Sequence, residues 1–557
     1  MATRLKPNPR QFKPSLFVLL AIFCLLPIKH PAALFGHPQT ATSENDFDYE
    51  VKLVPLEIEG LTGIHSFAYA RHEGKLLLVG GRTDGLHARQ PFASFPQDHN
   101  NRNIIVVDPS ARKSWSASLE SLETEVYEHL QSTNLNFEQW GDTLFIIGGY
   151  AYSETRRDHI TFPRLTTLQV SKVIEQVKHG GLTDEFFGYL DDERFAVAGG
   201  QLGRIGNRLF LVGGNRFDGR YNPRGFDTYT QTYTTMIQKF TLDNSGNSPV
   251  LLDYEFINDP EHLRRRDYNL VPYMFTDGKP GYLISSGVFR ADANLPFLYP
   301  VEIDETGYRP VTDFDQLLSH YHSPKFAFFD SEKQMLYMVF LGGLAQYYYD
   351  DDVMVQDNRV PFVNTISRVS RDAEGRFSEH PLTTTMPGLK GTSAEFIPNP
   401  DLVTNETGVI LLDGINDDQI LVGYMAGGIV SPILNPFEEN RTHETYADPT
   451  LYEIWLLRNA STSLPPEDLP SQFQLLPNYP NPFNPSTSIR FALPEPGMVT
   501  LTVYNLMGEK VAIPLDEIRG AGWHDVRFNA GGLASGVYIV RLTSADRTAS
   551  QKIMLIK

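Results

Sequence analysis

The stretches KLLLVGG (75–81), TLFIIGG (143–149) and RLFLVGG (208–214) share one pattern, four apolar residues followed by a glycine pair. An uninterrupted apolar run of this length favours a strand that is buried on both faces, as in the middle of a stacked sheet. A glycine pair permits backbone angles that a side chain forbids, and it lets neighbouring chains approach closely. The repeated pattern therefore predicts an all-β body built from several similar sheets.

Weaker copies of the pattern occur further along the chain. They are GYLISSG (281–287), MLYMVFLGG (335–343) and GVILLDG (408–414). Together with the three strong copies they predict six sheets between residues 60 and 460. RFAVAGG (194–200) is interpreted either as the start of an innermost strand or as a separate sheet, so seven sheets are the alternative.

The first copy continues with a polar loop, then NIIVVDP (103–109), then Trp115. A glycine pair, a second strand ending in Asp-Pro and a downstream Trp resemble the kelch repeat, which implies a β-propeller. Six copies over about 400 residues give roughly 66 residues per copy, above the ~50 usual for kelch repeats, so long inter-strand loops are expected. We expect a six-bladed kelch-like β-propeller over residues 41–463. YEVKLVPLEIE (49–59) is expected to close the ring as an outer strand of the last blade.

The N-terminal residues combine basic side chains with a short apolar run. Four basic side chains, Arg4, Lys6, Arg10 and Lys13, precede the apolar run LFVLLAIFCLL (16–26). A membrane-spanning helix needs about 20 apolar residues, so this shorter run predicts a secretory signal peptide over residues 1–40. An uncleaved anchor is the alternative. The single cysteine, Cys24, lies inside the run, so the stability of the mature protein is expected to come from packing rather than disulfides.

Charge is distributed unevenly along the chain. The formal net charge is -19, and residues 1–40 contain five basic and no acidic side chains. Residues 470–557 contain eight Lys or Arg against six Asp or Glu, which leaves -26 for residues 41–469. So acidic a body repels nucleic-acid phosphates and anionic lipid surfaces. We therefore expect no nucleic-acid partner, and hydropathy indicates no transmembrane segment in the mature protein.

A histidine pair is a candidate metal site. SHYHSP (319–324) sets His320 and His322 two residues apart, and on a strand both would point to one face, as a metal pair requires. Asp313 and Asp315 are close enough in sequence to complete the site. The alternative is two solvated or hydrogen-bonded histidines near a blade edge.

A second candidate site follows the fifth glycine pair and is expected on a blade loop. It consists of Tyr347, Tyr348, Tyr349, Asp350, Asp351 and Asp352. Aromatic faces stack on sugar rings and clustered carboxylates can hold calcium, so the stretch predicts ligand binding, with a structural calcium as the cofactor it would take. An acidic, solvated loop is the alternative.

Three consecutive arginines, Arg264, Arg265 and Arg266, form a small basic cluster in this acidic region. They could bind a carboxylate or sulfate, or they could pair with neighbouring acids.

The last eighty-five residues, 473–557, read as short alternating strands separated by turns. The predicted strands contain Phe473–Leu476, Ile489–Leu493, Val499–Val503, Val511–Leu515, His524–Phe528, Tyr538–Leu542 and the terminal QKIMLIK. About seven strands at even spacing are typical of a compact Ig-like β-sandwich.

Three motifs in this region resemble the type A C-terminal sorting domain of type IX secretion substrates. They are NYPNPFNPSTSIRFALPEPGMVTLTVYNLMGEKV (478–511), AGWHDVRFNAGGLASGVYIVRL (521–542) and KIMLIK (552–557). The resemblance implies Sec export followed by translocation across the outer membrane through the type IX machinery. It also implies removal of the domain by a surface peptidase, with the cargo released or attached to the cell surface through the outer membrane. An Ig-like adhesion module that is retained in the mature protein is the alternative.

The proline-rich stretch at the start of this domain is interpreted as its stiff entry. Pro480, Pro482 and Pro485 cannot donate to a strand ladder, so the stretch resists forming a central strand. LPPEDLPSQ (464–472) is interpreted as the exposed linker where cleavage would fall.

No local catalytic motif is present in the propeller region. We therefore expect an exported propeller that binds an extracellular glycan or protein ligand. The alternatives are a carbohydrate-active enzyme whose acid and base converge at the propeller channel, and a structural surface component. Propeller catalytic groups come from separate blades and leave no local motif, so sequence alone does not separate these classes.

Overall fold

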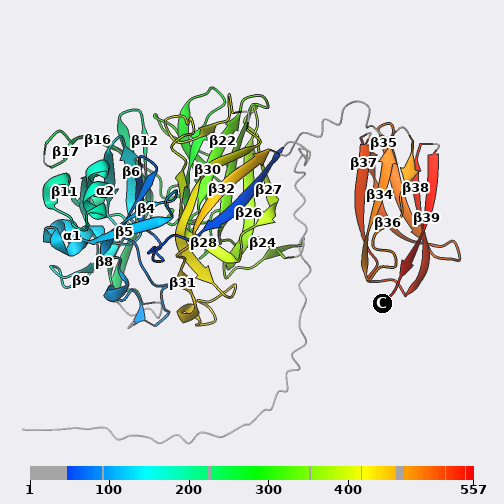
Figure 1. Ribbon diagram of the computed structural model, residues 1–557, viewed down its shortest axis with the longest axis horizontal. Coiled ribbons are helices and arrows are strands. Elements are labelled where there is room, and N and C mark those ends of the chain that lie inside the picture. The colour runs from blue at the N-terminus through cyan, green and yellow to red at the C-terminus, as the bar shows by residue number, and fades with distance from the viewer. Residues whose placement is uncertain are drawn as a thin grey trace, which may run out of the picture. The chain divides into compact units, whose positions relative to one another are not determined.

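The structure is a computed structural model that describes residues 47–90, 93–222, 228–246, 248–350, 353–415, 417–458, 470, 472–520, 522–545 and 547–557. The predicted signal peptide lies outside the described residues, as does nearly all of the predicted linker. The described part is dominated by antiparallel sheets (Figure 1), and two short α-helices accompany them, α1 (Thr124–Leu130) and α2 (Val170–Lys178). No helix in the described ranges is both long and apolar enough to cross a membrane.

Six sheets, each with four main antiparallel strands, follow one another along the chain. From the innermost strand outward, the first three are β2 (Ala68–His72), β3 (Lys75–Val79), β4 (Asn103–Asp108), β5 (Lys113–Ser118); β6 (Asn136–Trp140), β7 (Thr143–Ile147), β10 (Arg164–Gln169), β11 (Phe187–Asp191); and β12 (Gln201–Ile205), β13 (Arg208–Val212), β16 (Met236–Asp243), β17 (Val250–Asn258). The last three are β18 (Asn269–Met274), β19 (Pro280–Ser285), β20 (Val301–Ile303), β21 (Tyr308–Pro310); β22 (Lys325–Asp330), β23 (Met335–Leu344), β26 (Phe362–Arg371), β27 (Phe377–Thr385); and β28 (Leu389–Pro398), β30 (Gln419–Ser431), β32 (Leu451–Arg458), β1 (Tyr49–Leu56). The innermost strands of successive sheets contact one another from β2 round to β28, so the six sheets are the blades of a β-propeller.

The two ends of the propeller are joined within one blade. β1 pairs with β32 along its whole length, from Tyr49 opposite Arg458 to Leu56 opposite Leu451, and Figure 1 shows the blue strand beside it. The prediction that the first strand of the body closes the ring as an outer strand of the last blade is confirmed. Shorter hairpins extend the blades at the glycine-pair ends of their second strands, including β8 (Tyr150–Ser153) with β9 (Asp158–Thr161), β14 (Asn215–Gly219) with β15 (Tyr229–Tyr233), and β24 (Tyr347–Asp350) with β25 (Val353–Gln356).

The glycine pairs mark the places where one blade meets the next. Gly148 has φ +68°, and a Cβ atom there would lie 1.8 Å from the carbonyl oxygen of Val197 in the following blade. The N–H of Gly149 donates to that same oxygen at 3.0 Å. At the closing junction, Gly427 has φ +65°, and its Cβ would lie 2.2 Å from the carbonyl oxygen of Ile64. The glycines therefore allow backbone to pack directly on backbone between blades.

Two of the glycine motifs need reassignment. The expectation that GVILLDG is the sixth copy of the glycine-ended strand is wrong. That stretch contains only β29 (Ile410–Leu411), a two-residue strand beside β22. The sixth pair is Gly427–Gly428 in β30, whose apolar run was missed because Gly423 interrupts it where Phe396 packs against the backbone. RFAVAGG leads directly into β12, so it does not form a seventh blade.

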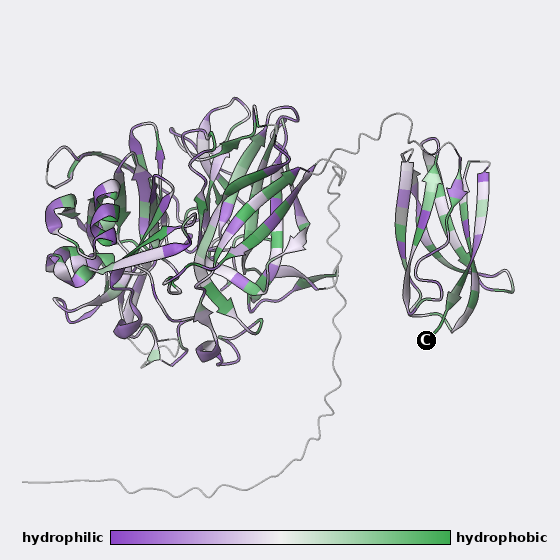
Figure 2. Ribbon diagram, in the orientation of Figure 1, coloured by the Kyte–Doolittle hydropathy of each residue, from purple (hydrophilic) through white to green (hydrophobic). Residues whose placement is uncertain are grey.

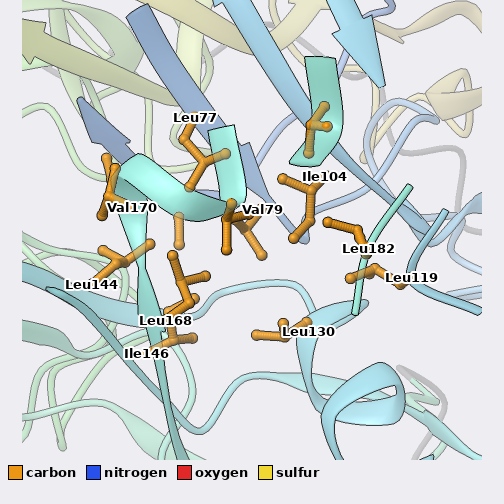
Figure 3. Close-up of a cluster of buried hydrophobic side chains, with 14 of the residues drawn as sticks. Leu77, Val79, Ile104, Leu119, Leu130, Leu144, Ile146, Leu168, Val170 and Leu182 are labelled. Atoms are coloured by element: carbon orange, nitrogen blue, oxygen red, sulfur yellow. The ribbon is translucent and has the colours of Figure 1, made fainter. Parts of the chain in front are cut away.

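Hydrophobic residues concentrate in the strands, as the green segments in Figure 2 show. Between the first two blades they form one continuous cluster (Figure 3), in which Leu77 and Ile104 from the first blade meet Leu144 and Leu168 from the second. Residues of α1 and α2 cover this cluster, because Leu130 and Val170 are fully buried in it. The long loops of these blades thus contribute to the core.

The C-terminal part is a seven-stranded sandwich of two sheets with a separate core. One sheet contains β33 (Gln474–Leu475), β34 (Ser486–Leu493) and β37 (Gly522–Asn529); the other contains β36 (Lys510–Arg519), β35 (Gly497–Tyr504), β38 (Gly536–Ser544) and β39 (Arg547–Leu555). Every strand expected from the alternating pattern is present, which confirms the predicted sandwich.

The proline-rich stretch belongs to the sandwich itself. The N–H of Tyr479 donates to the carbonyl of Ser488 at 3.0 Å, and that of Phe483 donates to the carbonyl of Met554 at 2.9 Å. The Phe483 side chain is only 2% exposed, and Asn478 donates to the carbonyl of Pro480 at 3.0 Å. The stretch therefore links β34 to the last strand of the domain, β39.

The backbone contact at the blade junction can be tested by comparing two glycine-to-alanine substitutions, one outside a junction and one within it. Gly74 has φ +72° but open space around it, so Gly74→Ala should cost about 1 kcal/mol of unfolding free energy for the left-handed backbone alone. Gly148→Ala should cost clearly more, because its new methyl group meets the Val197 carbonyl as well. Urea unfolding of both variants measures the difference, and equal costs would contradict the junction described here.

Candidate functional site

Six residues, one from each blade, form a ring that we call the neck ring. Five of them lie just before the innermost strand of their blade, and the sixth, Ser393, lies within β28. Its members are Ser66, Asn134, Gly199, Asp267, His322 and Ser393, and each has φ between +46° and +64°. The N–H of one member donates to the carbonyl of the previous member at five of the six junctions, with distances of 2.7 to 3.1 Å. Among the described residues the junction from Asp267 to His322 has no such hydrogen bond. The ring sets the register of all six innermost strands around one axis.

A cavity of about 560 Å³ lies inside the ring of innermost strands, and all six blades contribute to its wall. Asn134, Gly199, Asp267 and His322 of the neck ring lie at one end, and turn residues such as Glu73 and Gly141 lie at the other. In every blade the third residue after the neck-ring member lines this cavity. These third residues are Tyr69, Phe137, Leu202, Leu270, Lys325 and Phe396. The wall therefore combines three aromatic rings, two aliphatic side chains and one cation.

Three cations in the cavity wall have no carboxylate within 4.0 Å in the described part of the chain: Arg71, Arg204 and Lys325. Each makes a single side-chain hydrogen bond to the protein. Arg71 Nη1 donates to the carbonyl of Pro398 at 2.6 Å, Arg204 Nη1 donates to the carbonyl of Gly206, and Lys325 Nζ donates to Gln201 Oε1 at 3.3 Å. Most of their N–H groups therefore have no hydrogen-bond partner among the described residues.

Two carboxyl groups in the same wall, Glu138 and Glu395, accept no hydrogen bond from any described residue. Burial raises the pKa of Glu138 to about 8, although Arg204 and Arg71 oppose the rise. Burial also raises the pKa of Glu395, against the effect of Lys325. Burial is the main cause of the raised pKa of the Tyr69 phenol. The charges of Glu395 and Glu138 raise this pKa further, so both carboxyl groups lie near Tyr69. At neutral pH Glu138 is thus mainly a neutral acid that faces the cavity.

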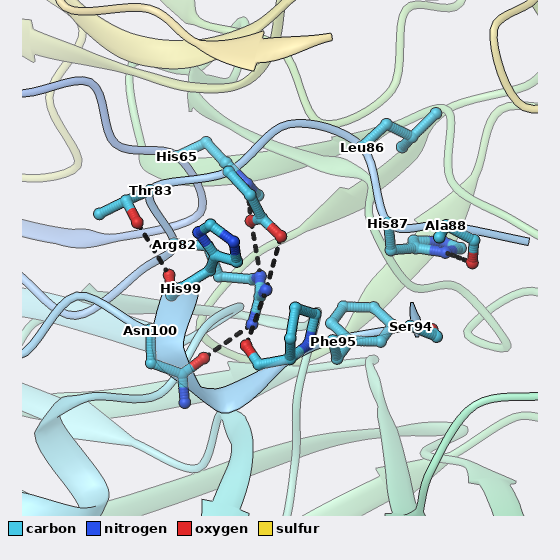
Figure 4. A network of polar contacts seen from close by, with 12 residues as sticks. His65, Arg82, Thr83, Leu86, His87, Ala88, Ser94, Phe95, His99 and Asn100 are labelled. Carbon is cyan, nitrogen blue, oxygen red and sulfur yellow. Dashed lines mark hydrogen bonds and ion pairs between the residues drawn. The ribbon is translucent and has the colours of Figure 1, made fainter. Parts of the chain in front are cut away.

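A second polar cluster lies beside the neck ring at the glycine-pair end of the first blade (Figure 4). Arg82 is 3% exposed, and its guanidinium donates to Asp84, to Asn100 Oδ1 at 2.7 Å and to the carbonyl of Pro96 at 3.1 Å. Although burial opposes it, hydrogen bonds from His65 and Arg82 lower the pKa of the Asp84 carboxyl. With its donors used inside the protein, Arg82 supports the loop rather than a ligand.

Aromatic side chains gather at this same end. His87 stacks on Phe95 with ring centroids 4.9 Å apart, and Phe217 stacks on Tyr229 at 4.7 Å in the β14–β15 hairpin. Tyr221 contacts both groups. The rings are partly buried against one another, so they hold the hairpins and long loops of the rim together.

The histidine pair does not have the predicted geometry. His320 and His322 lie in the loop between β21 and β22, not on a strand, and the backbone turns at His322 with φ +46°. His320 is completely buried, whereas His322 lies at the cavity end with Nδ1 3.3 Å from Ser393 Oγ. Burial lowers the pKa of both imidazoles to about 4. Asp313 and Asp315 are exposed, and the described residues contain no group of three potential ligands around a metal position, so a metal here stays a prediction without a third ligand.

The tyrosine-rich stretch lies on a blade loop, as expected. Tyr347, Tyr348, Tyr349 and Asp350 form β24 of the hairpin that follows the fifth glycine pair, and the tyrosines are half-buried while Asp350 is exposed. Asp351 and Asp352 lie outside the described residues. The prediction that this stretch binds a ligand or calcium therefore stays a prediction.

The three consecutive arginines have separate partners. Arg264 lies over the ring of Tyr233 at 3.8 Å, Arg265 is fully buried and donates to the carbonyls of Ser286 and Tyr299 at 2.9 Å, and Arg266 forms an ion pair with Asp267. Of the two possibilities given for these arginines, pairing with a neighbouring acid is the one observed for Arg266. None of the three was predicted to share a site with the cavity residues, and none lines the cavity.

The raised pKa of Glu138 predicts how stability depends on pH. Between pH 4.5 and about 8 the unfolded chain loses the Glu138 proton while the folded chain retains it, so this group makes stability fall as pH rises through that window. Glu138→Gln removes the effect. The unfolding free energy of Glu138→Gln minus that of the unaltered protein should therefore increase from pH 5 to pH 8 and then level off. Urea titrations at several pH values test this, with Glu120→Gln on the surface as the control; a difference that does not change with pH would show that Glu138 is solvated.

Comparison with known proteins agrees with the C-terminal assignment. Residues 478–557 match the family model described as "Secretion system C-terminal sorting domain", Por_Secre_tail, which covers the sandwich. No curated protein matches the sequence of this chain.

Two solved structures show limited likeness. The "Structure of YjhT" has 9% sequence identity and a TM-score of 0.39, covering 71% of this chain and 98% of that one. PorZ, described as an essential bacterial surface component of the type-IX secretion system of Porphyromonas gingivalis, has 8% identity and a TM-score of 0.13, covering 92% of this chain and 100% of that one. Neither likeness is close enough to carry a functional argument. The family match carries the assignment: the seven-stranded sandwich that follows the propeller in the sequence is a type IX secretion C-terminal sorting domain.

Proposed function

We propose that this protein is a surface-attached or released binding protein of a bacterium, and that its propeller binds a saccharide in the central cavity. The observation that carries the proposal is the composition of the cavity wall. The partly exposed rings of Tyr69 and Phe137 stand beside cations that have no carboxylate partner, and acids that accept no hydrogen bond, among the described residues. Stacking faces combined with convergent hydrogen-bonding groups suit a ring that carries many hydroxyls.

The size and position of the cavity support the same function. Its volume of about 560 Å³ lies within the roughly 300–1,000 Å³ typical of small-molecule sites. Its lining comes from all six blades, so the neck ring and the blade junctions hold the side chains in fixed positions. A preorganised site of this kind loses little conformational entropy when a ligand binds.

The sorting domain supports export through the type IX secretion system and attachment at the cell surface. The partners proposed for it are the type IX machinery and a surface peptidase that would cleave in the linker 464–472. The propeller would then be the cargo that is presented outside the cell. The signal peptide over residues 1–40 would supply the preceding step across the inner membrane.

One observation favours an enzyme as the second candidate. Glu138 and Glu395 are two carboxyl groups with raised pKa values that lie near the same tyrosine, and neither accepts a hydrogen bond from the described residues. Acid and base groups tuned by burial are typical of catalysis on glycosides. Product analysis on any saccharide that binds would separate the two functions, since a binding protein releases its ligand unchanged.

Deleting residues 473–557 tests the export route. The truncated protein should fold its propeller, because the sandwich has its own core, and it should stay inside the outer membrane. Cell fractionation with an antibody against the propeller measures its location. Appearance of the truncated propeller in the medium or on the cell surface would contradict the role of the sandwich.

Calorimetric titration of the full chain with a panel of defined oligosaccharides tests the binding site. Lys325→Gln should weaken binding by about tenfold or more, because hydrogen bonds to charged groups contribute about 1.5–3 kcal/mol. Lys75→Gln is the matched control, since Lys75 lies outside the cavity near Asp108. Absence of binding across the panel, or binding that Lys325→Gln leaves unchanged, would overturn the proposed site.

A further inference from the structure

We propose that the saccharide carries an oxyanion, a carboxylate or a sulfate, and that Arg71 and Arg204 bind this group beside Glu138. This inference rests on the proposed function and names the chemical class of the ligand. It follows from three features of one sector of the cavity: the position of the two arginines, their incomplete use by the protein, and the acid that stands between their blades.

The three residues occupy neighbouring blades at nearly the same depth. Arg71 and Arg204 are each the fifth residue after the neck ring, in the first and third blades, and Glu138 is the fourth in the second blade. All three line the cavity. Because the second blade lies between the first and the third, Glu138 lies in the sector that the two arginines flank. Both arginines act on the Glu138 carboxyl electrostatically, which is consistent with this placement.

Each arginine is positioned by the protein but not neutralised by it. Arg71 is held by its hydrogen bond to the carbonyl of Pro398, and its backbone N–H and carbonyl are fixed by Gln139 through two bonds of 2.9 Å. Arg204 lies over the ring of Trp140 at 5.0 Å, and its Nε is buried without a hydrogen-bond partner among the described residues. A guanidinium in this state is suited to an oxyanion, because its planar fork matches carboxylate and sulfate geometry.

Glu138 does not cancel these positive charges at neutral pH. The charged and titratable groups that face it are Tyr69 and Arg71 from β2, Arg204 from β12 and Tyr282 from β19, and Glu406 lies near Tyr282. With its pKa at about 8, the Glu138 carboxyl keeps its proton below that pH and can donate a hydrogen bond to an oxyanion. Above that pH it becomes a carboxylate and repels the same ligand.

The positive side chains of the cavity wall contrast with the net negative charge of the propeller. Residues 41–469 carry a formal charge of -26, so the field outside the cavity opposes anions. Arg71 and Arg204 share the cavity wall with Glu73, Asp267 and Glu406, but neither arginine has a carboxylate within 4.0 Å among the described residues, so its charge lacks direct compensation. An anionic group on the ligand supplies that compensation.

Calorimetry of the full chain with three matched probes tests the inference: an oligogalacturonate, the same oligosaccharide after reduction of its carboxyl groups, and a sulfated form of the reduced oligosaccharide. We expect the reduced, neutral form to bind at least about tenfold more weakly than a charged form. The two charged probes distinguish a carboxylate from a sulfate. Equal affinity of charged and neutral forms, with both weakened by Lys325→Gln, would overturn the oxyanion inference while leaving the proposed saccharide site intact.

Substitutions locate the effect. Arg204→Gln and, separately, Arg71→Gln should abolish the preference for the charged form while affinity for the neutral form is kept. Arg208→Gln is the matched control, because Arg208 lies on the next strand, outside the cavity, and pairs with Glu255. A preference that survives in both cavity variants would overturn the inference, and melting temperatures of the variants exclude a loss of folding.

The pH profile gives an independent readout. Affinity for the charged form should fall as pH rises from 7 to 9, because Glu138 ionises in this range. Glu138→Gln, which keeps a donor but cannot ionise, should bind with the same affinity from pH 6 to pH 9. A decline of equal size in both proteins would show that Glu138 does not contact the anion.

Discussion

Contact between the backbones of adjacent blades is the constraint on which the propeller depends. Where Gly148 meets the carbonyl of Val197 and Gly427 meets that of Ile64, there is no room for a side chain. The neck ring repeats this close approach nearer to the axis, with a left-handed residue from each blade and hydrogen bonds that run from one to the next. Since β1 completes the sixth blade, the same contacts extend round the closed circle. Blade orientation is therefore set by main-chain geometry, which changes little when loops vary.

The candidate site follows from this arrangement. Each innermost strand leaves the neck ring in the same register, so the third and fifth residues after it face the cavity in most blades. Blade-to-blade differences in these residues then decide the chemistry, and Tyr69, Phe137 and Lys325 occupy equivalent positions with different roles. Residues that alternate with them, such as Asn136 and Asn269, hydrogen-bond across to the next blade and keep the wall together.

The sandwich and the propeller are two folded parts with separate hydrophobic cores. The sandwich has its own hydrophobic core and is held closed by a stretch that packs against its last strand, so it can direct export without contributing to the propeller cavity. The propeller, in turn, has a cavity whose wall combines three cations with five acidic side chains contributed by different blades. Substitutions in the innermost strands can therefore change the cavity wall without touching the sorting domain.

Sequence alone determined the all-β class, the recurring glycine-ended strands, the closing role of β1 and the seven strands of the sorting domain. These features depend on local patterns, such as apolar runs, period-two alternation and turn residues, that are complete within a short stretch. It failed at GVILLDG, where an apolar run suggested a central strand, and at β30, where Gly423 broke the run because Phe396 packs over it. It also placed His320 and His322 on a strand, whereas both lie in a loop, because the left-handed turn at His322 belongs to the neck ring and leaves no trace in local spacing. Only the tertiary structure could bring Arg71, Glu138, Arg204, Lys325 and Glu395 together, since each comes from a different blade and none has a motif around it. The burial that raises the pKa of Glu138 is likewise a property of the closed ring, because water is excluded from that carboxyl only when neighbouring blades surround it.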